Sequence, residues 1–219
     1  MAHPPDATSG GLRLVLVTPG DREPRRTLRL IDSALAGGVT AVLLRESQLD
    51  PTPRAELAMQ VREATRKHGA LLLMHRDVGI ANDCGADAVH TGHGGQPVEA
   101  IRSDAPGLLV GRSCHWPVTA EDRRADYVLL SPFRPTPKSH PRPLLASDQV
   151  RACLDDPQLG PTVALGGLTV DDVPSLPEGL AGVAVLRAIS EADDPREAAA
   201  ELRAALDARL HAVSEDAPR

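Results

Sequence analysis

Short, nearly continuous apolar runs recur along the chain, and such runs are typical of strands buried in a parallel sheet. A polar residue or a glycine follows most of these runs, so polar chemistry begins where the strands end. We expect eight strands, at residues 12–17, 39–44, 71–74, 88–90, from 108 onward, 127–130, 162–165 and 183–186.

Between most of these strands, apolar residues recur every three or four positions, which is the spacing of an amphipathic helix. Pro51 and Pro53 favour the start of one helix, Gly69 ends it, and Ser147 is the expected N-cap of another. We expect helices at residues 25–36, 51–68, 78–81, 98–101, 120–124, 147–154 and from 194 onward.

Strands that alternate with helices predict a parallel sheet, and eight such units predict closure into a single (β/α)₈ TIM barrel. The alternative is an open, doubly wound sheet. Because no Gly-x-Gly-x-x-Gly motif follows the first strand, the dinucleotide-binding version of that sheet is disfavoured. We expect the barrel at residues 12–213, with disordered tails at 1–11 and 214–219.

Composition narrows the class of protein. Hydrophobic residues make up 42% of the chain, as in an ordinary globular protein. The net charge is −6 and the basic residues are scattered, which argues against a nucleic-acid partner. The three cysteines show no metal-binding or disulfide spacing and fit a reducing cytoplasm. No apolar run is long enough to span a membrane, so we expect a cytoplasmic protein with no membrane partner.

Candidate chemistry gathers where the strands end, because the active site of such a barrel lies at the carboxyl ends of its strands. His115 follows the fifth strand, and imidazole suits proton transfer near neutral pH. The alternative is a histidine that simply bonds to a neighbouring carbonyl. Gly166 and Gly167 follow the seventh strand and Arg187 the eighth, where barrels often bind phosphate. Other strand ends deliver Arg45, His75, Ser113 and Lys138.

Several segments along the chain are informative by their order and spacing: 17–18, 37–46, 85–90, 111–115, 125–129, 135–138, 164–168 and 182–186. Together they resemble the thiamine phosphate synthase superfamily, over nearly the whole of residues 12–210. The resemblance implies a (β/α)₈ barrel that binds phosphorylated small molecules in thiamine biosynthesis. In one branch, synthases join a pyrimidine diphosphate to a thiazole phosphate and use Mg²⁺. The TenI-like branch includes tautomerases that move a proton on a thiazole phosphate.

Three departures from the synthase pattern decide between the branches. Ser47 stands where the synthases carry a diphosphate-binding lysine, His75-Arg76 stands where they carry Asn-Asp, and Gly95 stands where they carry a further Asp. Both carboxylates that would hold Mg²⁺ are therefore missing. We expect no cofactor, with Mg²⁺ needed only if the protein is a synthase after all.

The run Gly111-Arg112-Ser113-Cys114-His115 resembles the tautomerase branch, whose matching histidine carries the proton. The resemblance thus implies a metal-independent thiazole phosphate tautomerase. The alternatives are a thiamine phosphate synthase and a non-catalytic barrel that binds a phosphorylated ligand. We also expect that the chain can form a homo-oligomer. The expected catalytic residues are His115 and His75, and the expected substrate- or phosphate-binding residues are Arg45, Ser113, Lys138, Gly166, Gly167 and Arg187.

Overall fold

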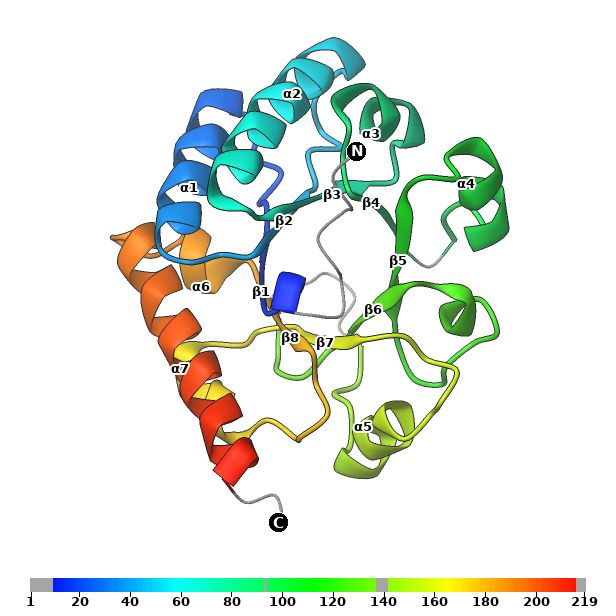
Figure 1. Cartoon of the computed structure of the whole chain (residues 1–219), viewed down its shortest axis with the longest axis vertical. Coiled ribbons are helices and arrows are strands. Elements are labelled where there is room, and N and C mark those ends of the chain that lie inside the picture. The colour runs from blue at the N-terminus through cyan, green and yellow to red at the C-terminus, as the bar shows by residue number, and fades with distance from the viewer. Residues whose placement is uncertain (1–9, 93, 137–141, 216–219) are drawn as a thin grey trace.

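Eight parallel strands close into a barrel in chain order (Figure 1). The computed structural model describes residues 10–92, 94–136 and 142–215. Pairing of the first strand with the eighth closes the sheet and confirms the predicted (β/α)₈ barrel. The strands are β1 (Leu14–Val17), β2 (Ala41–Leu44), β3 (Leu71–His75), β4 (Ala88–Thr91), β5 (Leu109–Cys114), β6 (Tyr127–Leu130), β7 (Thr162–Leu165) and β8 (Gly182–Val185).

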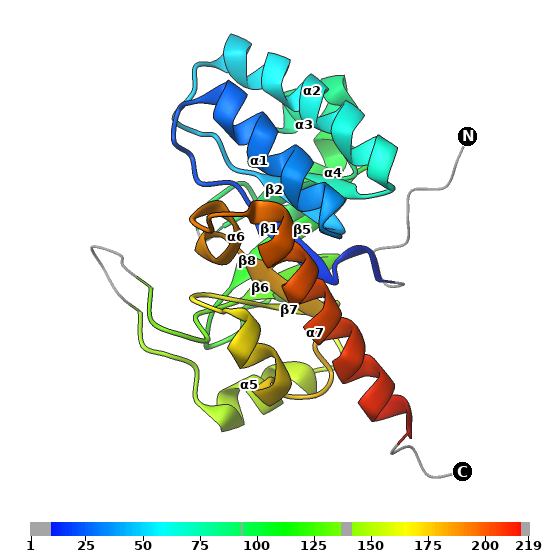
Figure 2. The same cartoon turned by 90° about the vertical axis from the view of Figure 1, so that its left-hand side faces the viewer.

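Helices surround the strands on the outside of the barrel (Figure 1). The α-helices are α1 (Pro24–Ala36), α2 (Pro51–His68), α3 (Val78–Cys84), α4 (Val98–Asp104), α5 (Ser147–Leu154), α6 (Arg187–Ser190) and α7 (Pro195–Glu215). The first and last long helices, α1 and α7, lie side by side (Figure 2). Two 3₁₀-helices, η2 (Asp122–Arg124) and η3 (Val170–Ser175), stand in the β5–β6 and β7–β8 connections. Among the described residues, no helix is long and apolar enough to cross a membrane.

Some boundaries differ from those we expected. The prediction that Ser147 is an N-cap is wrong, because Ser147 is already the first residue of α5. The N-terminal end of α5 is held instead by Gln149, whose side-chain oxygen accepts a hydrogen bond from the N–H of Ala146 at 3.1 Å. Helix α7 runs to Glu215, past the expected end of the barrel at residue 213. The expected tails fall largely on residues 1–9 and 216–219, which lie outside the described residues.

The pleat of each strand divides its side chains between two apolar layers. One layer fills the barrel and includes Leu43, Leu73 and Leu129, and the other lies between the strands and the helices. Tyr127 is completely buried inside the barrel, where it packs over Gly111 on the neighbouring strand. A Cβ atom at Gly111 would overlap the tyrosine ring. The packing of Tyr127 therefore requires glycine at position 111.

The same alternation sorts the polar residues of β5. Ser113 faces into the barrel, and Cys114 faces the other way and is buried in the outer apolar layer. Arg112 also points outward, where its Nε atom lies 3.0 Å from Oδ1 of Asp122 in a buried ion pair. The backbone N–H of Thr119 also donates to the Asp122 carboxylate, at 2.9 Å. This cluster fixes the turn that follows His115.

Candidate functional site

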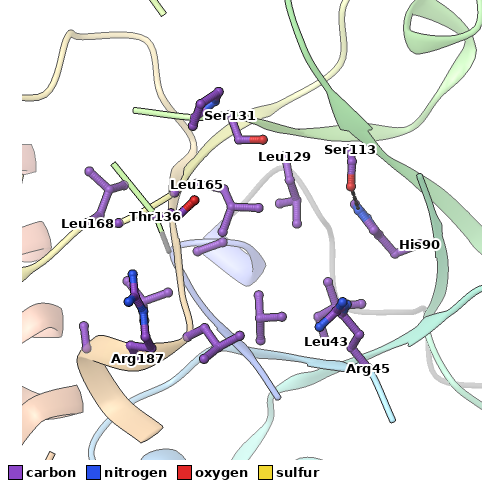
Figure 3. Close-up of a pocket in the computed structure, with 18 of the residues that line it drawn as sticks. Leu43, Arg45, His90, Ser113, Leu129, Ser131, Thr136, Leu165, Leu168 and Arg187 are labelled. Carbon is purple, nitrogen blue, oxygen red and sulfur yellow. Dashed lines mark hydrogen bonds between the residues drawn. The ribbon is translucent and has the colours of Figure 1, made fainter. Parts of the chain in front are cut away.

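A cavity of about 640 Å³ opens at the carboxyl ends of the strands. Seven of the eight expected site residues line it, as Figure 3 shows for those that it labels. The eighth, Lys138, lies outside the described residues. The seven are Arg45, His75, Ser113, His115, Gly166, Gly167 and Arg187. The barrel thus brings together residues that are spread over most of the chain, because parallel strands all end at the same rim.

His115 is held by the end of the neighbouring strand β6. Its Nδ1 atom lies 2.7 Å from the backbone carbonyl oxygen of Ser131, and the Ser131 hydroxyl oxygen lies 3.3 Å from the same nitrogen. Because a carbonyl can only accept, Nδ1 carries a proton and donates it to Ser131. The neutral ring then has its lone pair on Nε2. Bonding to a neighbouring carbonyl, our alternative for this residue, is therefore real and also orients the ring for proton transfer.

His75 ends β3, and its environment differs from that of His115. Its Nδ1 atom is buried and has no hydrogen-bond partner among the described residues. Burial, followed by the nearby charges of Arg76 and Arg45, lowers the pKa of His75 to about 4. Its ring is therefore neutral near pH 7. Such an imidazole is a weak base and forms little conjugate acid at that pH.

Gly166 and Gly167 form the turn after β7, with φ angles of +108° and +65° that favour glycine. A Cβ atom at Gly167 would lie 2.5 Å from the carbonyl oxygen of Pro135, so the turn also packs against the loop after β6. Within the described parts of the chain, the N–H groups of Gly167 and Leu168 have no acceptor. Adjacent N–H groups of this kind suit an anionic oxygen.

Two arginines stand on opposite sides of the cavity. Arg187 is the first residue of α6 and lies on one side, and Arg45 follows β2 and lies on the other (Figure 3). Neither guanidinium forms an ion pair with a described carboxylate, although eleven ion pairs join other charged side chains of the described residues. Uncompensated positive charge at both sides favours an anionic ligand.

Arg76 adds a third cation at the rim. It has a φ angle of 66°, a left-handed conformation that is costly for a residue with a side chain. A Cβ atom built on Gly92 would lie 3.6 Å from its Nη2 atom and 3.9 Å from the hydroxyl oxygen of Ser113. The guanidinium of Arg76 therefore reaches the β4 side of the mouth, close to Ser113.

Two ionisable residues of the described cavity wall were not among the expected site residues. Glu191 is the only carboxylate among the described residues of the cavity wall, and it comes into place because α6 has only four residues. Nothing in the sequence signals so short a helix. His90 is 1% exposed but also reaches the cavity. Its ring nitrogens lie 3.3 Å from the hydroxyl of Tyr127 and 3.0 Å from that of Ser113.

The cavity wall does not fit Mg²⁺, which prefers a shell of hard oxygen ligands. The wall offers imidazole and guanidinium groups with the single carboxylate of Glu191. Glu46 and Asp77, the nearest carboxylates in the sequence to the expected metal positions, do not line the cavity, although Oε2 of Glu46 is buried with no hydrogen-bond partner among the described residues. The N–H of Gly20 donates to Glu46, and Asp77 forms an ion pair with Arg54. Burial raises the pKa of Glu46.

Known proteins resemble this chain along most of its length. The family described as thiamine monophosphate synthase matches residues 14–189. A thiamine-phosphate synthase of Thermobifida fusca is 38% identical over 200 residues, covering 87% of this chain and 90% of the relative. One of Mycobacterium tuberculosis is 38% identical over 214 residues, covering 90% and 95%. A thiamine phosphate pyrophosphorylase structure from Pyrococcus furiosus superposes with a TM-score of 0.82 at 27% identity, covering 92% of this chain and 98% of the other.

These relatives bear on the branch as well as on the family. Their names describe the transferase, so they support our alternative, a synthase, better than the expected isomerase, which they do not confirm. They do confirm the superfamily and its place in thiamine biosynthesis. A match over residues 14–189, joined to relatives of this identity and coverage, shows that the chain belongs to the thiamine monophosphate synthase family.

Proposed function

We propose that this member of the family catalyses a metal-independent proton transfer on a phosphorylated thiazole, as a thiazole phosphate tautomerase. The observation that carries the proposal is the cavity wall itself, whose described residues combine an oriented imidazole with two arginines and a single carboxylate. A tautomerisation removes a proton from one carbon and returns a proton at another position, with no change in oxidation state and no leaving group. It therefore needs an acid–base group and an anchor for the phosphate, but no metal.

His115 is the proposed proton carrier. With Nδ1–H donated to the Ser131 carbonyl, Nε2 is the atom that takes the proton from carbon and then returns it. His75 is the second candidate. Its pKa of about 4 makes it a weaker base, so it is better suited to contact a substrate in its neutral form.

The phosphate of the substrate is proposed to bind at the Gly166-Gly167 turn and Arg187. The N–H groups of Gly167 and Leu168 have no acceptor in the described chain, and the Arg187 guanidinium has no carboxylate partner there. A phosphate at this position would accept hydrogen bonds from both kinds of donor. Arg45 and Ser113, on the other side of the cavity, would then contact the heterocycle.

A synthase is the second candidate function, and the names of the relatives favour it. That reaction joins a pyrimidine diphosphate to a thiazole phosphate and releases diphosphate, whose charge Mg²⁺ neutralises in the synthases. In this chain Arg76 stands at one of the expected metal-ligand positions. A fixed guanidinium supplies positive charge to an anion but cannot bind a metal ion.

The two functions are separated by assaying both reactions with the same protein. We expect turnover of a thiazole phosphate tautomer in the presence of a chelator, and no thiamine phosphate from the two synthase substrates with Mg²⁺. His115→Gln is the matched control, because it keeps a polar side chain that can still donate to the Ser131 carbonyl. Condensation that depends on Mg²⁺ would establish the synthase and refute the proposal. Binding of phosphorylated ligands without either turnover would support the non-catalytic alternative.

A further inference from the structure

A chain of three hydrogen-bonding side chains lies below the cavity, inside the barrel. The hydroxyl of Tyr127 lies 3.3 Å from Nδ1 of His90, and Nε2 of His90 lies 3.0 Å from the hydroxyl oxygen of Ser113. Figure 3 shows the second of these contacts, at the edge of the cavity. Tyr127 and His90 are 0% and 1% exposed, so water cannot replace either partner.

The tyrosine hydroxyl determines which atoms donate and which accept in these two hydrogen bonds. Among the described residues, its only hydrogen-bond partner is Nδ1 of His90. If Nδ1 carried the proton, the buried O–H of Tyr127 would have no acceptor, which is unfavourable for a donor that water cannot reach. The tyrosine therefore donates to Nδ1. The imidazole then carries its single proton on Nε2, and that N–H donates to Ser113.

The ring of His90 holds only one proton at neutral pH. Burial is the main cause that lowers its pKa to about 3, and the neighbouring His75 and the charge of Arg112 act in the same direction. A doubly protonated ring would donate to both hydroxyls, and the O–H of Tyr127 would then have no acceptor among the described residues. The neutral ring removes that possibility.

Ser113 is the end of the chain that meets the cavity. Its oxygen accepts from His90, so its own O–H must point elsewhere, and no other described group accepts it. We propose that Tyr127 and His90 are positioning residues that fix Ser113 as a hydrogen-bond donor to an acceptor atom of the substrate, such as a heterocycle nitrogen. This inference rests on the proposed function only in taking the cavity as the place where the substrate binds.

The first experiment reads the tautomer of His90 directly and needs no activity. In protein labelled with ¹⁵N-histidine, two-bond couplings between the ring protons and nitrogens distinguish a proton on Nε2 from one on Nδ1. We expect His90 to be neutral at pH 7 with its proton on Nε2. Ser113→Ala, which removes only the partner of Nε2, assigns the signal. A proton on Nδ1, or on both nitrogens, would overturn the proposal.

The second experiment asks whether the hydrogen-bonded relay of Tyr127, His90 and Ser113 affects ligand binding. Tyr127→Phe removes the hydroxyl but keeps the ring that packs over Gly111. We expect it to weaken binding of a thiazole phosphate about two- to tenfold, the range for one neutral hydrogen bond. Binding of inorganic phosphate should be unchanged. Ser113→Ala should act in the same way, and Ser113→Thr, which keeps a hydroxyl, should restore binding.

The outcomes separate the relay from the proposed function. Equal affinity of Tyr127→Phe and the wild type for thiazole phosphate would refute a role for the relay in recognition. An equal loss for thiazole phosphate and inorganic phosphate would reduce Tyr127 to a structural residue and would also refute it. If the wild type binds neither probe, the proposed function fails while the tautomer of His90 is still decided by the spectrum.

Discussion

Acidification tests whether His75 and His90 are neutral in the folded protein. Burial is the main cause that lowers their pKa values, to about 4 and about 3. In the unfolded chain an imidazole titrates near pH 6.5. Between pH 6.5 and pH 4 the unfolded chain therefore binds one proton at each histidine that the folded protein does not bind. Stability should be fully present above pH 6.5 and should fall as the pH falls.

The size of this effect follows from the two pKa shifts. Each histidine that stays neutral in the fold lowers the free energy of unfolding by up to about 1.4 kcal/mol per pH unit. For fully buried His90, acidification from pH 7 to pH 5 should cost about 2 kcal/mol. His75 is partly exposed, so solvent screening reduces its share to about 1 kcal/mol. A total near 3 kcal/mol is a large part of a typical domain stability.

Urea unfolding at pH 7, 6 and 5 measures this loss. His75→Gln should make the decline shallower, because it removes one of the two groups. His68→Gln, at the exposed end of α2, is the matched control and should leave the decline unchanged. A free energy of unfolding that is constant between pH 7 and pH 5 would show that the two imidazoles titrate in the fold as they do in the unfolded chain. His75 would then be as suitable an acid as His115, and our ranking of the two would fail.

Three further predictions concern single residues of the site and the barrel. His115→Gln should lower kcat for a thiazole phosphate tautomer by about 10²–10⁴-fold while KM changes little, and an unchanged kcat would exclude His115 as the proton carrier. Arg187→Ala should weaken a phosphorylated ligand by about 10- to 150-fold in Kd, as expected for one charge-assisted hydrogen bond, and calorimetry that shows no loss would place the phosphate elsewhere. Gly111→Ala should destabilise the fold by about 1–3 kcal/mol because the new methyl group overlaps the ring of Tyr127, and an unchanged Tm would contradict that packing.

The fold was predictable because it depends on patterns that are local in the sequence. The apolar run of β6 and the helix that begins at Pro51 each follow from a few adjacent residues. Seven site residues could be named in advance for the same reason, since they follow strands whose ends must meet at one rim. The opposite orientations of Ser113 and Cys114 needed only the two-residue period of a strand.

The rest depends on contacts between distant segments. The carbonyl of Ser131 reaches His115 because two neighbouring strands end at the same level, and no pattern in the sequence encodes that distance. The pairing of Tyr127 with His90 joins positions 37 residues apart across the barrel. Glu191 enters the cavity wall through the short length of α6, which is a tertiary detail. The donor and acceptor roles at the site therefore had to come from the structure.

The different surroundings of the imidazoles assign them different tasks. Around His75, burial and then the charges of Arg76 and Arg45 oppose protonation and lower the pKa, so that ring is neutral near pH 7. The main partner of Nδ1 in His115 is a carbonyl dipole, which accepts the same N–H whether or not Nε2 carries a second proton. The ring of His115 can thus keep one orientation through both halves of a proton shuttle. A ring held in this way keeps Nε2 in one place while a proton is removed from carbon and another is returned. The partner is a backbone carbonyl, so no substitution of the Ser131 side chain removes it.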